Sequence, residues 1–151
     1  MLTASFASLP ALAGSEIGVS DWLTIDQARI DLFAEATGDR QWFHVDTARA
    51  AREMPGGKTI AHGYLTLSLI PGLVAGLLRI EGLTRGINYG SDKVRFTNMV
   101  PAGSRVRARQ KLLSVTPRGG GLQLVSEITV EIEGEKRPAC IAETISILYD
   151  R

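Results

Sequence analysis

The stretch Ala61–Arg79 reads AHGYLTLSLIPGLVAGLLR and is the longest apolar run with helical spacing in the chain. Leucines that are four positions apart share one face of such a helix, namely Leu65, Leu69, Leu73 and Leu77. Because the other positions are also largely apolar, the pattern predicts a helix that is buried nearly all round. Pro71 has no backbone N–H, so we expect a kink or a restart of the helix there.

The second half of the chain alternates between apolar and polar residues, which is typical of β-strands. One such segment begins at Arg105, the residues Thr116–Gly121 turn the chain back, and a second segment covers Leu122–Ile132. A last strand is expected over Ala139–Tyr149, and a short one earlier, over Ile17–Ile25. These elements predict a single α+β domain, in which a long central helix is wrapped by a curved antiparallel β-sheet.

A row of basic residues lies on one face of the segment that begins at Arg105. Folding this hairpin about Gly119 places each of three cations opposite a glutamate. The expected pairs are Arg105 with Glu133, Arg107 with Glu131 and Lys111 with Glu127. Cross-strand charge pairs of this kind stabilise a sheet by roughly 0.2–1 kcal/mol each. We therefore interpret the row as a solvated sheet face and expect no nucleic-acid partner.

The composition is that of an ordinary globular domain, with 151 residues, 44% hydrophobic and 22% charged. We expect residues 1–151 to form one domain, with residues 1–15 as a short N-terminal extension that packs on it. The net charge of +1 favours neither a nucleic acid nor an anionic membrane as partner. The apolar run Tyr64–Leu78 is too short to span a bilayer, and the single cysteine, Cys140, is typical of a cytoplasmic protein. Its apolar neighbours predict a buried strand thiol.

An acid and an imidazole stand five positions apart in the segment Phe33–His44. A helical pattern that starts at Asp26 ends at Gly38, a natural C-terminal stop, so Asp39 is expected in the loop that follows. His44 is expected just before a second short helix over residues 46–52. An Asp/His pair held against apolar surface suits acid–base chemistry on a water molecule. The plainer alternative is that Asp39 only shapes the turn and that Asp46 satisfies His44.

Three motifs together resemble the MaoC-like dehydratase family, which includes the (R)-specific enoyl-CoA hydratases. They are the Gly38-Asp39 pair followed by His44, the segment Ile60–Gly63, and the segment Tyr89–Phe96 with Pro101–Ser104 behind it. The resemblance covers about residues 16–150. One departure is that Gln41-Trp42 replaces the Asn-Pro of the family motif. The resemblance implies a hot-dog fold and favours a homodimer.

The resemblance also implies an Asp39–His44 dyad that adds water to a trans-2-enoyl thioester, or removes it from the 3-hydroxyacyl product. Backbone N–H groups near Gly63 would then bind the thioester oxygen, and His62 would orient that turn. We expect the acyl chain in a cleft formed by aromatic and amide side chains, namely Gln41, Trp42, Phe43, Tyr64 and Asn88. No cofactor is expected beyond the thioester substrate. Two histidines eighteen positions apart make a poor metal set, so no metal is expected.

Two other functions remain open from the sequence. A hot-dog thioesterase would use a carboxylate to direct water at the thioester carbonyl, and an acyl-thioester-binding protein would carry out no reaction. The acyl group's carrier, either coenzyme A or acyl-carrier protein, is also left open. Release of a free thiol would identify a thioesterase, whereas an Asp39→Asn change would have no effect on a protein that only binds.

Overall fold

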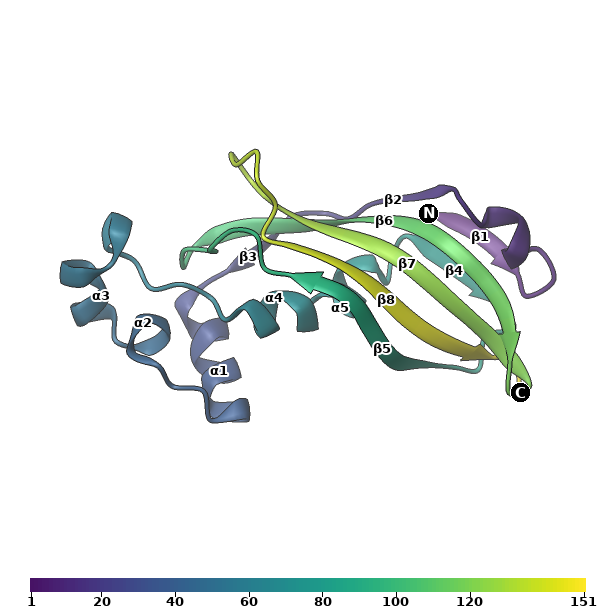
Figure 1. Ribbon diagram of the computed structural model, residues 1–151, viewed down its shortest axis with the longest axis horizontal. Coiled ribbons are helices and arrows are strands. Elements are labelled where there is room, and N and C mark those ends of the chain that lie inside the picture. Colours follow the sequence, from purple (N-terminus) through teal and green to yellow (C-terminus); the bar gives the residue numbers. More distant parts are fainter.

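The computed structural model describes residues 1–151, and its main feature is a curved antiparallel sheet wrapped around two short helices (Figure 1). The strand order is β2-β6-β7-β8-β5, and β3 also pairs with β6. This arrangement confirms the α+β class and the hot-dog-like fold. The strands of this sheet are β2 (Glu16–Val19), β3 (Leu23–Ile25), β5 (Arg85–Arg95), β6 (Ser104–Arg118), β7 (Gly121–Ile132) and β8 (Cys140–Tyr149).

The helices fall into two groups (Figure 1). Helices α4 and α5 lie against the sheet, while α1, α2 and α3 extend beyond one end of it. Their bounds are α1 (Gln27–Thr37), α2 (Trp42–Val45), α3 (Thr47–Glu53), α4 (Gly63–Ser68) and α5 (Ile70–Val74). No helix combines the length and the apolar character that crossing a bilayer requires.

The prediction of one long helix over Ala61–Arg79 is wrong in its extent. Helix α4 ends at Ser68 and α5 covers only Ile70–Val74, with Pro71 in the first turn of α5. The expected restart at Pro71 is therefore confirmed. Proline fits the first turn of a helix, where its missing N–H would have no intrahelical acceptor. Two glycines in the second half of the stretch, Gly72 and Gly76, lower the helix propensity further.

The prediction that this helical segment is buried nearly all round is also wrong. Leu65 and Ile70 are buried, but Tyr64 is 66% exposed. Pro71 and Gly72 are exposed as well. The reason is that the sheet covers only one side of the segment, and no second layer of this chain covers the other (Figure 1).

The register predicted for the central hairpin is confirmed. Arg107 pairs with Glu131, and Lys111 with Glu127. Arg105 lies opposite Glu133, and the Glu133 backbone N–H donates to the Arg105 carbonyl at 2.9 Å.

Ion pairs cross the strands at two of these three positions. Arg107 Nη2 lies 3.1 Å from Glu131 Oε2, and Arg105 Nη1 lies 2.9 Å from Glu133 Oε2. Arg109 bridges Glu16 and Glu131. The three arginines of the basic row are thus paired within the sheet, as predicted, whereas Lys111 shares the predicted register with Glu127 without an ion pair.

Two strand features have no counterpart in the sequence-based prediction. β5 forms one edge of the main sheet, and its register to β8 shifts twice, between Asn88 and Gly90 and between Asp92 and Arg95. A separate two-stranded parallel sheet joins β1 (Leu2–Ser5) to β4 (Leu78–Glu81). β5 lacks regular alternation because of these bulges, and β1 gains its partner only through tertiary contact.

The core has two parts. The larger lies between α4–α5 and the sheet and includes Ile30, Leu65 and Val106. It also contains Cys140, which is a buried strand thiol as predicted, and burial raises its pKa to about 11. The smaller part lies at the other end of the sheet, where the N-terminal segment inserts the fully buried Leu9 beside Leu112.

Candidate active site

Helix α1 sets the position of Asp39. The Asp26 carboxylate caps its N-terminus by accepting from the Arg29 N–H at 2.9 Å. Gly38 ends the helix with φ +81°, and its N–H donates to the Ala34 carbonyl at 2.8 Å. A left-handed residue at this position is the usual helix stop, and it favours glycine. Asp39 therefore begins the loop that follows, as predicted, and is half-buried.

His44 lies inside the one-turn helix α2 and is only 5% exposed. Its Nδ1 lies 2.7 Å from the Ile60 carbonyl oxygen. Since a carbonyl can only accept, Nδ1 carries the proton and Nε2 keeps a free lone pair. The Gln27 side-chain amide donates to the His44 carbonyl at 2.8 Å and ties α2 to α1.

His62 joins the two halves of the site. Its Nε2–H donates to the Asp39 backbone carbonyl at 2.9 Å. Its ring stacks on that of His44, with centroids 3.7 Å apart and planes 20° apart, and Phe33 packs on it at 4.9 Å. His62 is 2% exposed, and its Nδ1 has no hydrogen-bond partner. This histidine thus holds the Asp39 loop against His44.

The fold brings Asp39, His44 and His62 into one cluster, with a ligand atom of each within 4.8 Å of the others. A water molecule placed between the Asp39 carboxylate and His44 Nε2 would contact both groups. A metal ion fits less well, because it would have to lie in the plane of each ring that binds it. The two rings are stacked and nearly parallel, so their in-plane lone pairs do not meet at the spacing of zinc ligands, roughly 2.0–2.1 Å.

The pKa of His44 is lowered from its ordinary value. Burial is the largest cause, since it disfavours the charged ring, and the neighbouring His62 acts in the same direction. The Ile60 carbonyl and Asp39 act in the opposite direction. The net effect keeps His44 neutral near pH 7, which is the form that accepts a proton.

A pocket of about 350 Å³ opens beside His44. Gly63 and Thr66 of α4 line it, together with Phe96 and Arg137 from the other side. A Cβ on Gly63 would lie 2.6 Å from the Phe96 ring, so this close approach requires glycine. Thr66 is a residue that the sequence analysis missed: it is buried, and its hydroxyl has no partner. Its place four positions after His62, one helical turn on, is the only signal that would have indicated it.

The structure does not gather all the predicted cleft residues. Trp42 and Phe43 line neither main pocket: Trp42 lies under the Arg49 guanidinium, and Phe43 packs edge-on against His44 at 4.5 Å. Tyr64 packs edge-on against Phe96. Gln41 precedes α2 and makes no side-chain cap.

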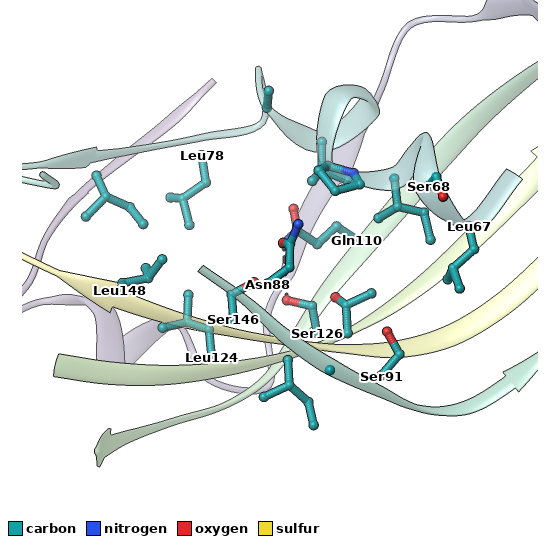
Figure 2. A pocket seen from close by; sticks show the side chains of 18 of the residues that line it. Leu67, Ser68, Leu78, Asn88, Ser91, Gln110, Leu124, Ser126, Ser146 and Leu148 are labelled. Carbon is teal, nitrogen blue, oxygen red and sulfur yellow. Dashed lines mark hydrogen bonds between the residues drawn. The ribbon is translucent and has the colours of Figure 1, made fainter. Parts of the chain in front are cut away.

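Asn88 lies away from His44, in a second and larger pocket (Figure 2). Trp42, Phe43 and Tyr64 thus line neither of these two pockets, and their contact with an acyl chain stays a prediction. The sequence indicated that these residues are near the motif but not which way their rings point.

Comparisons with known proteins agree on one family. Residues 8–132 match the model of the MaoC like domain. The chain is 51% identical to the 3-hydroxyacyl-thioester dehydratase Z of Mycobacterium tuberculosis, over 93% of each chain. It is 49% identical to Nodulation protein N of Rhizobium leguminosarum bv. viciae, over 95% of this chain and 91% of that one.

Solved structures show the same architecture. The unliganded R-hydratase PhaJ1 of Pseudomonas aeruginosa superposes with a TM-score of 0.71, covering 92% of this chain and 83% of that one. At 24% identity this likeness is one of fold.

Proposed function

Because this chain belongs to the MaoC-like dehydratase family, we propose that it is a hydro-lyase that interconverts (R)-3-hydroxyacyl thioesters and trans-2-enoyl thioesters. The observation that carries the proposal is the cluster of Asp39, His44 and His62, with ligand atoms within 4.8 Å of one another. The name of the relative that is 51% identical, a 3-hydroxyacyl-thioester dehydratase, supports the same reaction.

In the hydration direction, a water molecule bound between the Asp39 carboxylate and His44 Nε2 attacks the β-carbon. His44 Nε2 takes a proton from the water as the new C–O bond forms. The electron pair of the double bond moves toward the thioester carbonyl, and a proton then returns to the α-carbon. Asp39 orients the water and stabilises the cationic imidazole. Dehydration follows the same steps in reverse.

The thioester oxygen gains negative charge during the reaction, and backbone N–H groups at the start of α4 are suited to bind it. Gly63 lines the His44 pocket at the first position of α4, and the Phe96 ring fills the space that a side chain there would take. His62 acts as a positioning residue, since its Nε2–H holds the Asp39 carbonyl. Tyr64 packs against Phe96, which lines the His44 pocket, and Gln41 precedes α2, so both are proposed to contact the substrate.

The proposed substrate carrier is either coenzyme A or acyl-carrier protein, in the cytoplasm, and the proposed assembly is a homodimer. The edge strand β5 supports the dimer, because it has no partner on one side and exposes Ile87 and Tyr89. An exposed edge of this kind is usually covered or paired.

The direct test follows the loss of enoyl absorbance when the protein is mixed with crotonyl-CoA. Asp39→Asn and His44→Ala are each expected to lower kcat about 10²–10⁴-fold, the usual contribution of a general acid or base. Asp46→Asn is the matched control, since Asp46 only caps α3 and asparagine caps as well.

Chiral analysis should give the (R)-3-hydroxy product. Release of free thiol without hydration would instead establish a thioesterase. Binding of crotonyl-CoA with neither reaction would establish a protein that only binds acyl thioesters.

A further inference from the structure

The larger pocket, of about 550 Å³, lies further along helix α4 than the catalytic one. Thr66 lines the His44 pocket, whereas the next two residues, Leu67 and Ser68, line the larger pocket. A helix rises 1.5 Å per residue, so Ser68 lies only about 7.5 Å along the axis from Gly63. An acyl chain that follows α4 from a thioester held at Gly63 would extend toward the larger pocket.

The far end of this pocket is apolar. In Figure 2, Leu78, Leu124 and Leu148 lie at one end of the pocket, and Leu67 and Ser68 at the other. The three leucines of the far end belong to the smaller core, which the N-terminal segment completes. This end is suited to receive the tail of a hydrocarbon chain.

Between the two ends, the wall of the pocket formed by the sheet carries polar side chains. We call the following residues the polar band: Asn88, Gln110, Ser126, Thr144 and Ser146. Strand pairing holds them side by side, because Asn88 pairs with Ser146, and Ser126 with Thr144. Figure 2 shows Asn88, Gln110, Ser126 and Ser146 together in the middle of the pocket.

Most of the band's hydrogen-bonding capacity is unused within the chain. The one side-chain hydrogen bond runs from Gln110 Nε2 to Ser126 Oγ, at 3.1 Å, and Ser126 is 4% exposed. The Asn88 amide and the Thr144 hydroxyl make no side-chain hydrogen bond. A plain alkyl chain lying over these groups would remove their water and return no hydrogen bond, which is unfavourable.

We infer that this pocket selects acyl thioesters that carry a hydroxyl or carbonyl oxygen at mid-chain, with that oxygen bound by the polar band. The inference rests on the proposed function, since it concerns the acyl chain of the same substrate. Gln110 and Asn88 are suited to this role because their amides both donate and accept, so they bind either kind of oxygen.

The test compares trans-2-decenoyl-CoA with a series of analogues that carry a single hydroxyl or ketone at successive mid-chain carbons. For the wild-type protein, we expect kcat/KM to be about tenfold higher for the best analogue than for the plain chain. Gln110→Leu should bring that ratio to about one. The ratio should fall because the plain chain is used as well as before or better, while the oxygenated chain is used less well.

Gln123→Leu is the matched control, because Gln123 lies on β7 but outside the pocket, where it accepts from Arg118. It should keep the wild-type ratio. If Gln110→Leu fails to fold, Asn88→Leu on the exposed edge strand replaces it. A wild-type ratio of one or less for every analogue would overturn the inference.

Calorimetric binding of saturated decanoyl-CoA and its mid-chain hydroxy analogues separates this inference from the proposed function. Tighter binding of the oxygenated chain without any hydration would refute the proposed reaction and uphold the pocket assignment. Hydration of plain chains, with no preference for oxygenated chains in rate or binding, would uphold the proposed reaction and refute the pocket assignment.

Discussion

Backbone carbonyls set the tautomers of the two histidines. The Ile60 backbone carbonyl accepts a hydrogen bond from His44 Nδ1–H, and the Asp39 backbone carbonyl accepts one from His62 Nε2–H. Burial lowers the pKa of His44, and the His62 ring that stacks on it at 3.7 Å acts in the same direction. At the scale of single residues, the site is therefore built to keep a neutral imidazole beside a carboxylate.

This arrangement predicts the pH dependence of activity. Because His44 acts as base in its neutral form, kcat/KM should rise with pH through its folded pKa and then level off. That pKa lies below the ordinary value of 6.5. If the inflection of kcat/KM on the acid side lies at or above pH 6.5, His44 is not the base.

The same shift predicts a loss of stability in acid. Between the lowered folded pKa and 6.5, the unfolded chain binds a proton at His44 that the folded chain does not. Stability should therefore fall as pH decreases below 6.5 and be unaffected by this group at higher pH. Urea unfolding of the wild type and of His44→Gln, compared between about pH 5 and pH 7.5, measures the difference. Parallel curves for the two proteins would exclude the effect.

The contact between Gly63 and Phe96 gives a second prediction at this scale. Gly63→Ala should destabilise the protein by about 1–3 kcal/mol, because the new methyl group overlaps the Phe96 ring. In a Phe96→Ala background the same change should be nearly neutral. A double-mutant cycle by chemical denaturation measures the coupling. An equal effect of Gly63→Ala in both backgrounds would show that the ring is not the obstacle.

At the scale of elements, helix α1 shows how local signals place a catalytic side chain. Asp26 fixes its start and Gly38 its end, and Asp39 follows at once. Both signals are local, because a cap needs only a side chain within the first turn and a stop needs only one left-handed residue. Asp39 could therefore be assigned to a loop from the sequence alone.

Gly38→Ala should cost about 1–2 kcal/mol of stability, since an L-residue at φ +81° is strained although nothing lies within 4 Å of the new Cβ. Gly72→Ala is the matched control. It also meets nothing within 4 Å but lies in α5, so it should be neutral or stabilise by about 0.4–1 kcal/mol. Thermal or urea unfolding of both variants gives the comparison. Equal effects in the two variants would mean that backbone strain at Gly38 is negligible.

In the whole molecule, the main sheet has two edges, one formed by the short strands β2 and β3 and the other by the long strand β5. β5 has β8 on one side and no partner on the other. Aromatic and aliphatic side chains are exposed along and next to it, among them Tyr64, Ile87, Tyr89 and Phe96. A second copy of the chain that pairs at this edge would cover them.

We expect the wild-type protein to be a dimer by light scattering coupled to gel filtration, and Ile87→Lys to shift it toward monomer. A lysine is unfavourable in a buried edge contact, because burial of an unpaired charge is costly. Ile141→Lys is the control, since Ile141 is exposed on β8, inside the sheet. A monomeric wild type at micromolar concentration would refute the dimer.

Features that depend on local chemistry could be predicted from the sequence. The ends of α1, the hairpin register from Arg105 to Glu133, the buried strand thiol of Cys140 and the family all follow from neighbouring residues and short motifs. Capping, turn formation and alternation act over a few positions, so they can be read without knowing what lies across the fold.

The remaining features depend on how the elements pack in the tertiary structure. It split the stretch Ala61–Arg79 into α4 and α5 and left one side of them exposed. It made a strand of β5 despite its bulges, and it stacked His44 on His62 although they stand eighteen positions apart. It also placed Asn88 with Gln110 and Ser126 instead of with His44. Each of these outcomes depends on which surfaces pack together, and sequence periodicity shows that a face is apolar but not which element covers it.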